Sequence, residues 1–101
     1  MKKIKSAKFL LCLLALCAGA AYAAENPNSR NLAASCAACH GSNGHAVSGM
    51  AGLAGMDKNY IVTSMQDFKT GKRPATLMHQ IAKGYSDEQI GQIADYLSTQ
   101  K

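Results

Sequence analysis

The chain has 101 residues, enough for one small domain, and 48% of them are hydrophobic. Eleven Lys and Arg residues against six Asp and Glu give a net charge of +5, but four of the lysines lie within the first eight residues. Residues 24–101 alone carry seven basic and six acidic side chains, a net charge of +1. Without a clustered basic footprint, nucleic acid is excluded as an expected partner.

Residues 1–23 have the pattern of a secretory signal peptide. Lysines precede the apolar stretch 9–18, and Ala21-Tyr22-Ala23 matches an A-x-A cleavage site. We predict cleavage after Ala23, export to the periplasm, and one domain over residues 24–101. Lipid attachment at Cys17 is the weaker alternative, because the large residue Leu16 precedes it. No other stretch approaches the roughly 20 apolar residues of a membrane span, so stable membrane insertion is not expected.

The first half of this domain predicts one helix followed by a loop. Asn28 or Ser29 is a candidate N-cap for a helix that runs through Cys36. Five glycines among residues 41–55 then indicate a loop with close backbone approach.

The second half predicts three further helices. Asp57 is a candidate N-cap for a helix that ends at Gly71, with an apolar face formed by Ile61, Met65 and Phe68. A short helix is expected over residues 76–83. Ser86 and Gln89 form a capping-box pattern before a last helix with Ile90, Ile93, Ala94 and Leu97 on one face.

The predicted fold is therefore all-α, with three or four short helices. Gly91 and Ala94 are expected to let the last helix cross the first closely, at residues 33–34.

The motif that carries chemistry is Cys36-Ala37-Ala38-Cys39-His40, the C-x-x-C-H signature of covalent haem c attachment. Two thiols three residues apart lie on one side of a helical turn, where they can meet both vinyl groups of one porphyrin. His40 then follows below the ring, where its imidazole can ligate the iron.

Three other interpretations of the two cysteines are weaker. A thioredoxin-type site expects a βαβ setting, and a zinc site needs four ligands. A disulfide would leave unexplained how a 78-residue chain fills its core. One covalently bound haem c would fill that core as a large, mostly apolar plate.

A methionine as sixth ligand would close the iron and suit it to electron transfer, whereas an open site would suit gas binding. We predict Met78, because the chain can return over the opposite ring face after Pro74. Met65 is expected in the core, Met56 in packing contacts, and Met50 on the His40 side of the ring.

Two histidines remain as further candidates. His79 is the main rival ligand, and its alternative is an exposed helix position. His45 is expected on the surface.

The motif near the N-terminus, one downstream methionine and a C-terminal amphipathic helix resemble the class I c-type cytochromes. That resemblance implies a small all-α fold wrapped around one covalently bound haem, with terminal helices that pack on each other. Residues 56–86 more specifically resemble the cytochrome subunits of flavocytochrome c sulfide dehydrogenases. The similar segments are Met56-Asp57, the runs 66–71 and 76–78, and Ile81-Ala82-Lys83-Gly84-Tyr85-Ser86.

In that family the methionine of the Thr-x-Met stretch binds iron, which implies this role for Met78. The family subunit often has two haem domains, and this chain resembles a single-haem version. The relatives usually have a proline before Leu-Ala-Gly whose carbonyl accepts a hydrogen bond from the axial histidine. Here Ala51 and Gly52 precede Leu53, so another carbonyl must take that role for His40.

The resemblance implies one-electron transfer, with a flavoprotein that contains FAD as the electron donor and an unknown downstream acceptor. The chain would not be an enzyme by itself. The alternatives are a free-standing shuttle to a terminal oxidase and a haem sensor with a labile sixth site. The cations Lys69, Lys72 and Arg73 are candidates for a docking edge, or simply a solvated helix end.

Overall fold

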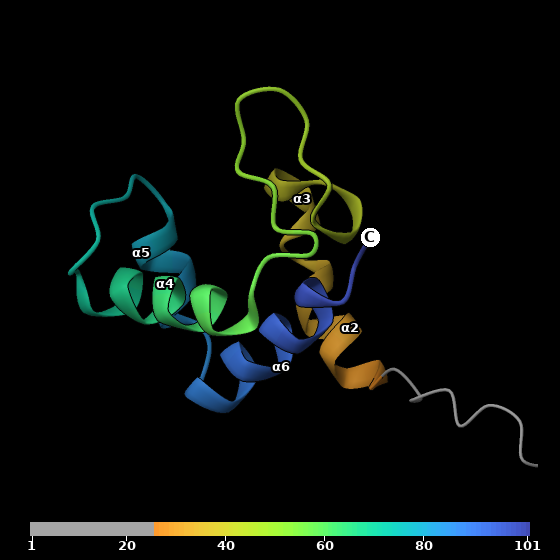
Figure 1. Cartoon of the computed structure of the whole chain (residues 1–101). Helices are drawn as coiled ribbons and strands as arrows, with labels where there is room; N and C mark the ends of the chain where they lie inside the picture. Colours follow the sequence, from red (N-terminus) through yellow and green to blue (C-terminus); the bar gives the residue numbers. More distant parts are fainter. Residues whose placement is uncertain (1–25) are drawn as a thin grey trace, which may run out of the picture.

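The computed structural model describes residues 26–101. The predicted signal peptide and its cleavage site lie outside the described residues, as do Cys12 and Cys17. Residues 26–101 form five α-helices and one short 3-10 helix, with no strand among them (Figure 1). None of these helices is long and apolar enough to cross a membrane. The predicted all-α class is confirmed.

The N-terminal part forms two helices where the sequence predicted one. The first, α2 (Pro27–Ala34), is capped by the Asn26 side chain, which accepts from the Asn28 amide at 3.0 Å. The expected caps at Asn28 or Ser29 were wrong because proline is favoured at the first helical position and therefore moves the cap to Asn26. The chain then turns at residues 35–36 before α3 (Ala37–His40) and the 3-10 helix η1 (Ser42–Gly44).

The remaining three helices begin and end close to their predicted positions. The N-cap of α4 (Lys58–Thr70) is Asp57, which accepts from the Tyr60 amide at 2.9 Å, and Gly71 ends the helix at φ +81°. The short helix α5 (Met78–Lys83) begins two residues later than predicted. At the start of α6 (Asp87–Ser98), both hydrogen bonds of the predicted capping box between Ser86 and Gln89 are present.

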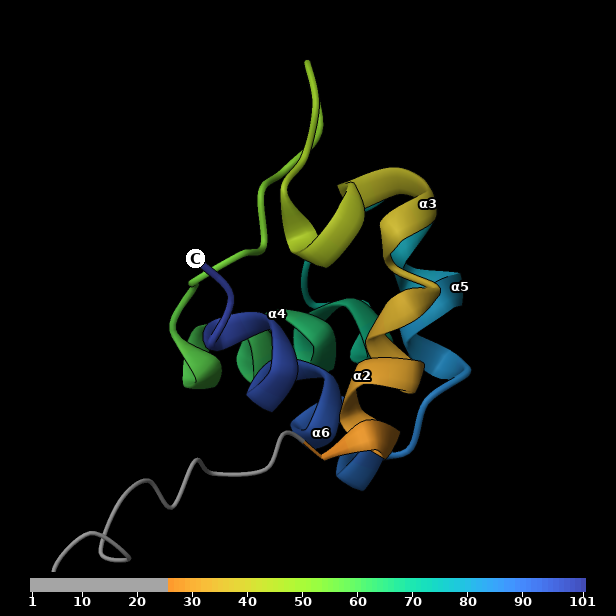
Figure 2. The ribbon, with the colours of Figure 1, turned by 90° about the vertical axis from the view of Figure 1, so that its right-hand side faces the viewer.

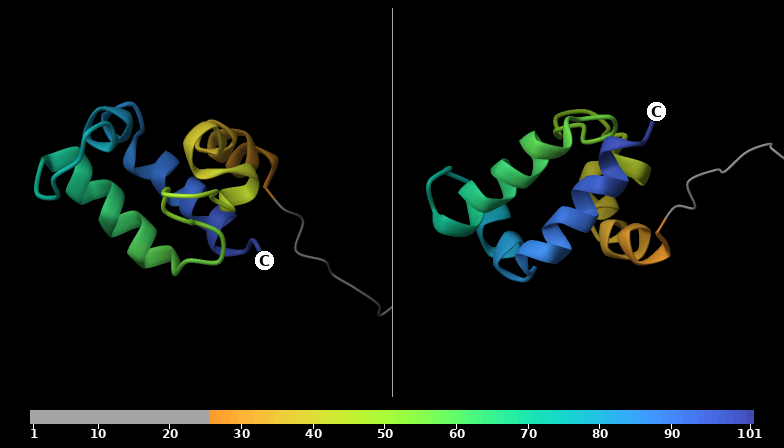
Figure 3. Two further views of the ribbon diagram at one scale, coloured as in Figure 1. Left: turned by 90° about the horizontal axis from the view of Figure 1, so that it is seen from above. Right: turned by 60° about the horizontal axis from the view of Figure 1, so that its bottom comes forward.

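The core is centred on α6, which runs between α4 and α2 (Figure 3). Ile90, Ile93 and Leu97 of α6 are its largest fully buried side chains. Burial of each such side chain stabilises the fold by about 1.5–3 kcal/mol. The other buried apolar residues are Ala33, Ile61, Met65, Ala82, Ala94 and Tyr96. This core is small, as the sequence predicted for a chain that packs around a large cofactor.

The expected crossing of the first and last helices is present (Figure 2). Ala33 of α2 and Ala94 of α6 are both buried, and Nδ2 of the Asn28 side chain donates to Gln92 Oε1 at 2.8 Å. The role predicted for Gly91 is wrong. A Cβ added at Gly91 would meet no atom within 4 Å, so this glycine permits no close approach.

The fold keeps the N-terminal segment apart from the middle segment. Figure 1 shows α3 and the loop that follows it at the top of the view, α4 with α5 at the left, and α6 below them. The view from above in Figure 3 shows the same separation. His40 ends α3 and Met78 begins α5, so the two residues belong to segments that lie apart in Figure 1.

Candidate haem-attachment site

Cys36 and Cys39 lie on one helical turn, with both thiols free. The amides of Cys39 and His40 both donate to the Cys36 carbonyl, at 3.3 and 2.9 Å. Cys36 is half-buried and Cys39 is exposed. Burial raises the pKa of the Cys36 thiol, although a hydrogen bond with Ser35 acts in the opposite direction. The pair thus presents two thiols from one turn, as covalent attachment to a porphyrin requires.

His40 is oriented by a backbone carbonyl in the loop that follows it. The distance between His40 Nδ1 and the Ala51 carbonyl oxygen is 2.8 Å. Because a carbonyl only accepts, Nδ1 carries the proton and donates. The lone pair that remains is on Nε2, which is the atom available to a metal. The carbonyl expected in place of the missing proline is therefore that of Ala51.

The loop that carries Ala51 is closed at its base by Gly44. The Gly44 carbonyl accepts from the amides of Leu53 at 2.9 Å and Ala54 at 3.1 Å. Gly44 itself has φ +78°, and a Cβ there would lie 2.7 Å from the Ala54 amide nitrogen. Only glycine fits both the conformation and the space, which explains one glycine of the predicted loop.

Met78 is the first residue of α5 and packs, half-buried, against the core. The other methionines lie where the sequence predicted. Met65 is buried in the core, and Met56 packs against it. Met50 is 45% exposed and directly precedes Ala51, so it lies on the His40 side of the site. The role of Met78 as second ligand stays a prediction.

The two other histidines have different environments. His45 is exposed, as predicted. His79 was expected to be exposed unless it binds iron, but it is half-buried. Its Nδ1 is buried and has no hydrogen-bond partner within residues 26–101.

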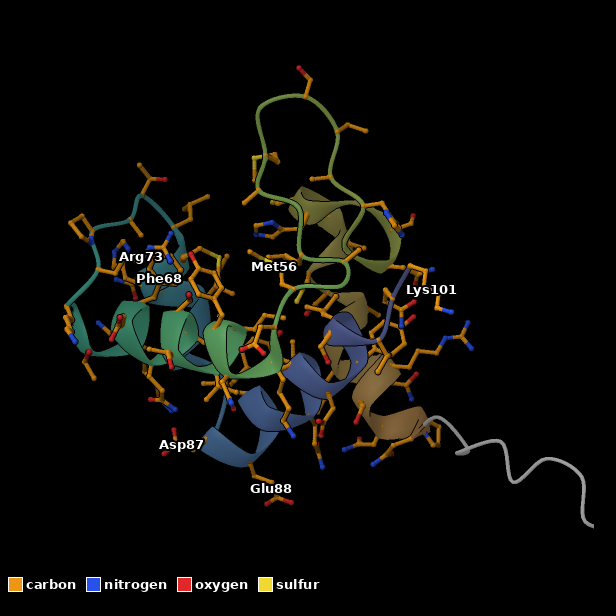
Figure 4. The ribbon with its side chains drawn as sticks, in the orientation of Figure 1. Met56, Phe68, Arg73, Asp87, Glu88 and Lys101 are labelled. Carbon is orange, nitrogen blue, oxygen red and sulfur yellow. The ribbon has the colours of Figure 1, made fainter. Side chains whose placement is uncertain are left out.

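Two of the three cations in the basic cluster make close contacts within the fold, whereas Lys72 is exposed and lies 3.9 Å from Asp67. Lys69 Nζ donates to the Tyr85 carbonyl at 2.7 Å and to Asp87 at 3.2 Å. The Arg73 guanidinium lies 4.8 Å from the centroid of the Phe68 ring, beside α4 (Figure 4), and donates to Ser64. These contacts favour the interpretation of a helix end over that of a free docking edge.

The donor set fits a covalently attached haem. Two free thiols share one turn, and an imidazole with a free Nε2 follows them. The thioether of Met78 comes from the first residue of α5. Within residues 26–101 no group of three His, Cys, Asp or Glu side chains gathers to hold a metal ion, so a zinc site of that kind has no ligand set there.

Sequence reasoning missed a contact that supports this site. The Tyr96 hydroxyl of α6 donates to Asn43 Oδ1 of η1 at 2.6 Å. The Ser-Asn-Gly run at 42–44 signals a turn, but only the folded chain brings Tyr96 to it.

Comparisons with known proteins agree with this geometry. The family model described as Cytochrome c matches residues 28–101. The cytochrome subunit of sulfide dehydrogenase from Chlorobaculum tepidum is 51% identical over 37 residues, which cover 37% of this chain and 34% of that protein. The structure of cytochrome c4 from Acidithiobacillus ferrooxidans matches with a TM-score of 0.68 and 31% identity, over 80% of this chain.

The chain spans only about half of that cytochrome c4, 52% of its length. The family match, in contrast, extends over nearly all of the described residues. The chain belongs to the cytochrome c family and is a class I c-type cytochrome, an electron-transfer protein with a haem c attached covalently through its Cys-x-x-Cys motif.

Proposed function

We propose that this cytochrome is a periplasmic one-electron carrier that receives electrons from the flavoprotein subunit of a sulfide dehydrogenase. In this proposal Cys36 and Cys39 hold the haem, and His40 and Met78 are the axial ligands. The observation that carries the ligand set is the hydrogen bond between His40 Nδ1 and the Ala51 carbonyl, which leaves Nε2 for iron.

The haem supplies the one-electron chemistry between ferric and ferrous iron. The chain supplies attachment, two ligands and burial. The His40 imidazole is held by Ala51, and Met78 by its place in α5 and its contact with the core. Held in this way, both residues would stay on the iron in either oxidation state, so little of the chain would rearrange during transfer. The chain itself makes and breaks no substrate bond.

The identity of the partner is supported by the 37-residue likeness to a sulfide dehydrogenase cytochrome subunit. Two large apolar side chains beside Met78 are exposed, Leu77 at 63% and Ile81 at 42%. They lie one helical turn apart and offer an apolar contact to a partner near the proposed ligand. Electron-transfer partners commonly meet through such small interfaces.

The test is untagged purification from the native source, followed by visible spectroscopy. A haem c spectrum with an additional flavin shoulder, both bleached by sulfide, is the expected result. Haem c absorption alone that sulfide does not change, even after purified flavoprotein subunit is added back, would contradict the proposed partner. It would favour the free-standing shuttle instead.

Location is tested on the same material. Release of the protein by osmotic shock, with Ala24 as its N-terminal residue, is expected. A chain that remains in the cytoplasmic fraction and retains residues 1–23 would contradict the periplasmic proposal.

A further inference from the structure

The carbonyl that orients His40 belongs to a loop with little packing of its own. Val47 in this loop is 76% exposed, and Met50 is 45% exposed. Gly49 at its tip has φ +84° and open space around it. The position of Ala51 must therefore be set where the loop meets the rest of the fold.

That junction is the turn at residues 42–44. Gly44 accepts the hydrogen bonds that close the loop, and its own amide donates to the Gly41 carbonyl at 3.0 Å. Asn43 precedes it with φ +54°, a left-handed conformation that asparagine tolerates better than most residues. A displacement of this turn would carry the base of the loop, and with it Ala51, away from His40.

Tyr96 holds the turn to the core. This side chain of α6 is only 8% exposed, and its hydroxyl donates to Asn43 Oδ1 at 2.6 Å. The next residue of α6, Leu97, accepts from the Gly55 amide at 2.9 Å and so fixes the far end of the loop. One turn of α6 therefore supports the loop at both ends.

We propose that Tyr96 is a positioning residue for the axial histidine. Its hydroxyl, through Asn43, fixes the turn from which the loop begins and so keeps the Ala51 carbonyl against His40 Nδ1. A strong bond at Nδ1 makes the imidazole a more basic ligand, which favours the ferric state. This inference rests on the proposed role of His40, which the spectrum of the wild-type protein tests separately.

The test variant is Tyr96→Phe, which removes only the hydroxyl. A pocket of about 220 Å³, lined in part by Asn43 and Tyr96, adjoins the bond, so water can reach the freed Asn43 Oδ1 and we expect the fold to be retained. The matched control is Tyr60→Phe, because Tyr60 is 51% exposed and its hydroxyl makes no hydrogen bond within residues 26–101.

Two measurements are compared in the haem-bearing proteins. In Tyr96→Phe the His40 Nδ1 proton should exchange with solvent about tenfold faster, while the amides of Ile93 and Ala94 exchange as in wild type. At a fixed ambient potential, the ratio of reduced to oxidised protein should rise about three- to tenfold. A tenfold change corresponds to about 59 mV for one electron.

A second variant, Asn43→Gly, keeps the positive φ accessible and removes the acceptor. It should reproduce both effects, and the double variant should add little, because both substitutions break one contact. The proposal is overturned if Tyr96→Phe and Asn43→Gly match Tyr60→Phe in both measurements. It is equally overturned if exchange at His40 accelerates only together with that of Ile93 and Ala94, which would indicate a role in stability alone.

Discussion

The two proposed axial residues are held in different ways. The His40 ring is fixed by a direct hydrogen bond of 2.8 Å to the Ala51 carbonyl. Met78 is placed by the start of α5 and by contact with the core, and a thioether is only a weak hydrogen-bond acceptor. The methionine side is therefore the one expected to open when the site is perturbed.

Replacement of Met78 by alanine should open the sixth position. The low-spin visible spectrum should become high-spin, and the reduced protein should bind carbon monoxide. The control is Met50→Ala, because Met50 is exposed on the His40 side and its loss should leave the spectrum unchanged. An unaltered low-spin spectrum in Met78→Ala would instead point to His79, whose buried Nδ1 has no partner in the described chain.

Asp87, at the start of α6 (Figure 4), makes the free energy of unfolding depend on pH. Hydrogen bonds from Gln66 and then Lys69 lower the pKa of this carboxyl below its ordinary value of about 3.9. The stabilisation is therefore complete above that ordinary value, and it is lost as the pH falls through the lowered pKa.

This pH dependence is measured by denaturant unfolding at a series of pH values from neutral to about pH 2. The free energy of unfolding should fall less with acid in Asp87→Asn than in wild type. Glu88→Gln serves as control, because Glu88 lies in the same first turn but makes no hydrogen bond within residues 26–101. Equal acid sensitivity in Asp87→Asn and wild type would contradict the assignment.

At the scale of elements, α6 connects the core to the site. Its inner face carries the fully buried Ile90, Ile93 and Leu97, and Tyr96 reaches from it to the turn after His40. Gly91 lies on the same helix without a packing role.

The open surroundings of Gly91 predict that Gly91→Ala stabilises the protein. Alanine favours the helix interior by about 0.5–1 kcal/mol over glycine, and here its methyl group meets no neighbour. Chemical denaturation should show a midpoint shifted to higher denaturant. A destabilised variant would instead support the role in close helix crossing that the sequence suggested for Gly91.

Alanine substitutions at two glycines of the loop should lower the stability by unequal amounts, although the two glycines have similar backbone angles. Gly44 and Gly49 have φ of +78° and +84°, so alanine at either costs about 1–2 kcal/mol in conformation. Only at Gly44 would the new Cβ also strike backbone, 2.7 Å from the Ala54 nitrogen.

Gly44→Ala should therefore lose clearly more stability than Gly49→Ala and should also shift the midpoint potential, because the loop that bears Ala51 must move. Denaturation and redox titration of both variants measure this difference. Equal losses of stability and unchanged potentials would show that the loop base does not position His40.

The elements that the sequence predicted well are those with local signals. Asp57, Gly71 and the Ser86–Gln89 pair each mark a helix end through contacts within a few residues, and the structure has all of them. The break between α2 and α3 lacks such a signal.

The contacts that support the site could not be predicted from the sequence, because they do not depend on local signals. The bond from Tyr96 to Asn43 joins residues 53 positions apart, and the acceptor for His40 is a backbone atom that any residue could supply. The Cys-x-x-Cys-His motif is local and was recognisable, whereas the atoms that orient its histidine depend on the whole fold.

At the scale of the molecule, the small size of the core is connected with the haem site. The largest fully buried side chains among residues 26–101 all lie on α6, and the proposed ligands come from two other segments, α3 and α5. A haem between these two segments would complete the core and bring His40 and Met78 to the same iron. Closed coordination by both residues is thus the central claim about this molecule.

The most direct test of that claim is the visible spectrum of the reduced wild-type protein at neutral pH, before and after carbon monoxide is added. A low-spin haem c spectrum that the gas leaves unchanged is the predicted result, because both axial positions are filled. A spectrum that shifts on addition of carbon monoxide would contradict a six-coordinate electron carrier and favour a sensor with a labile sixth site.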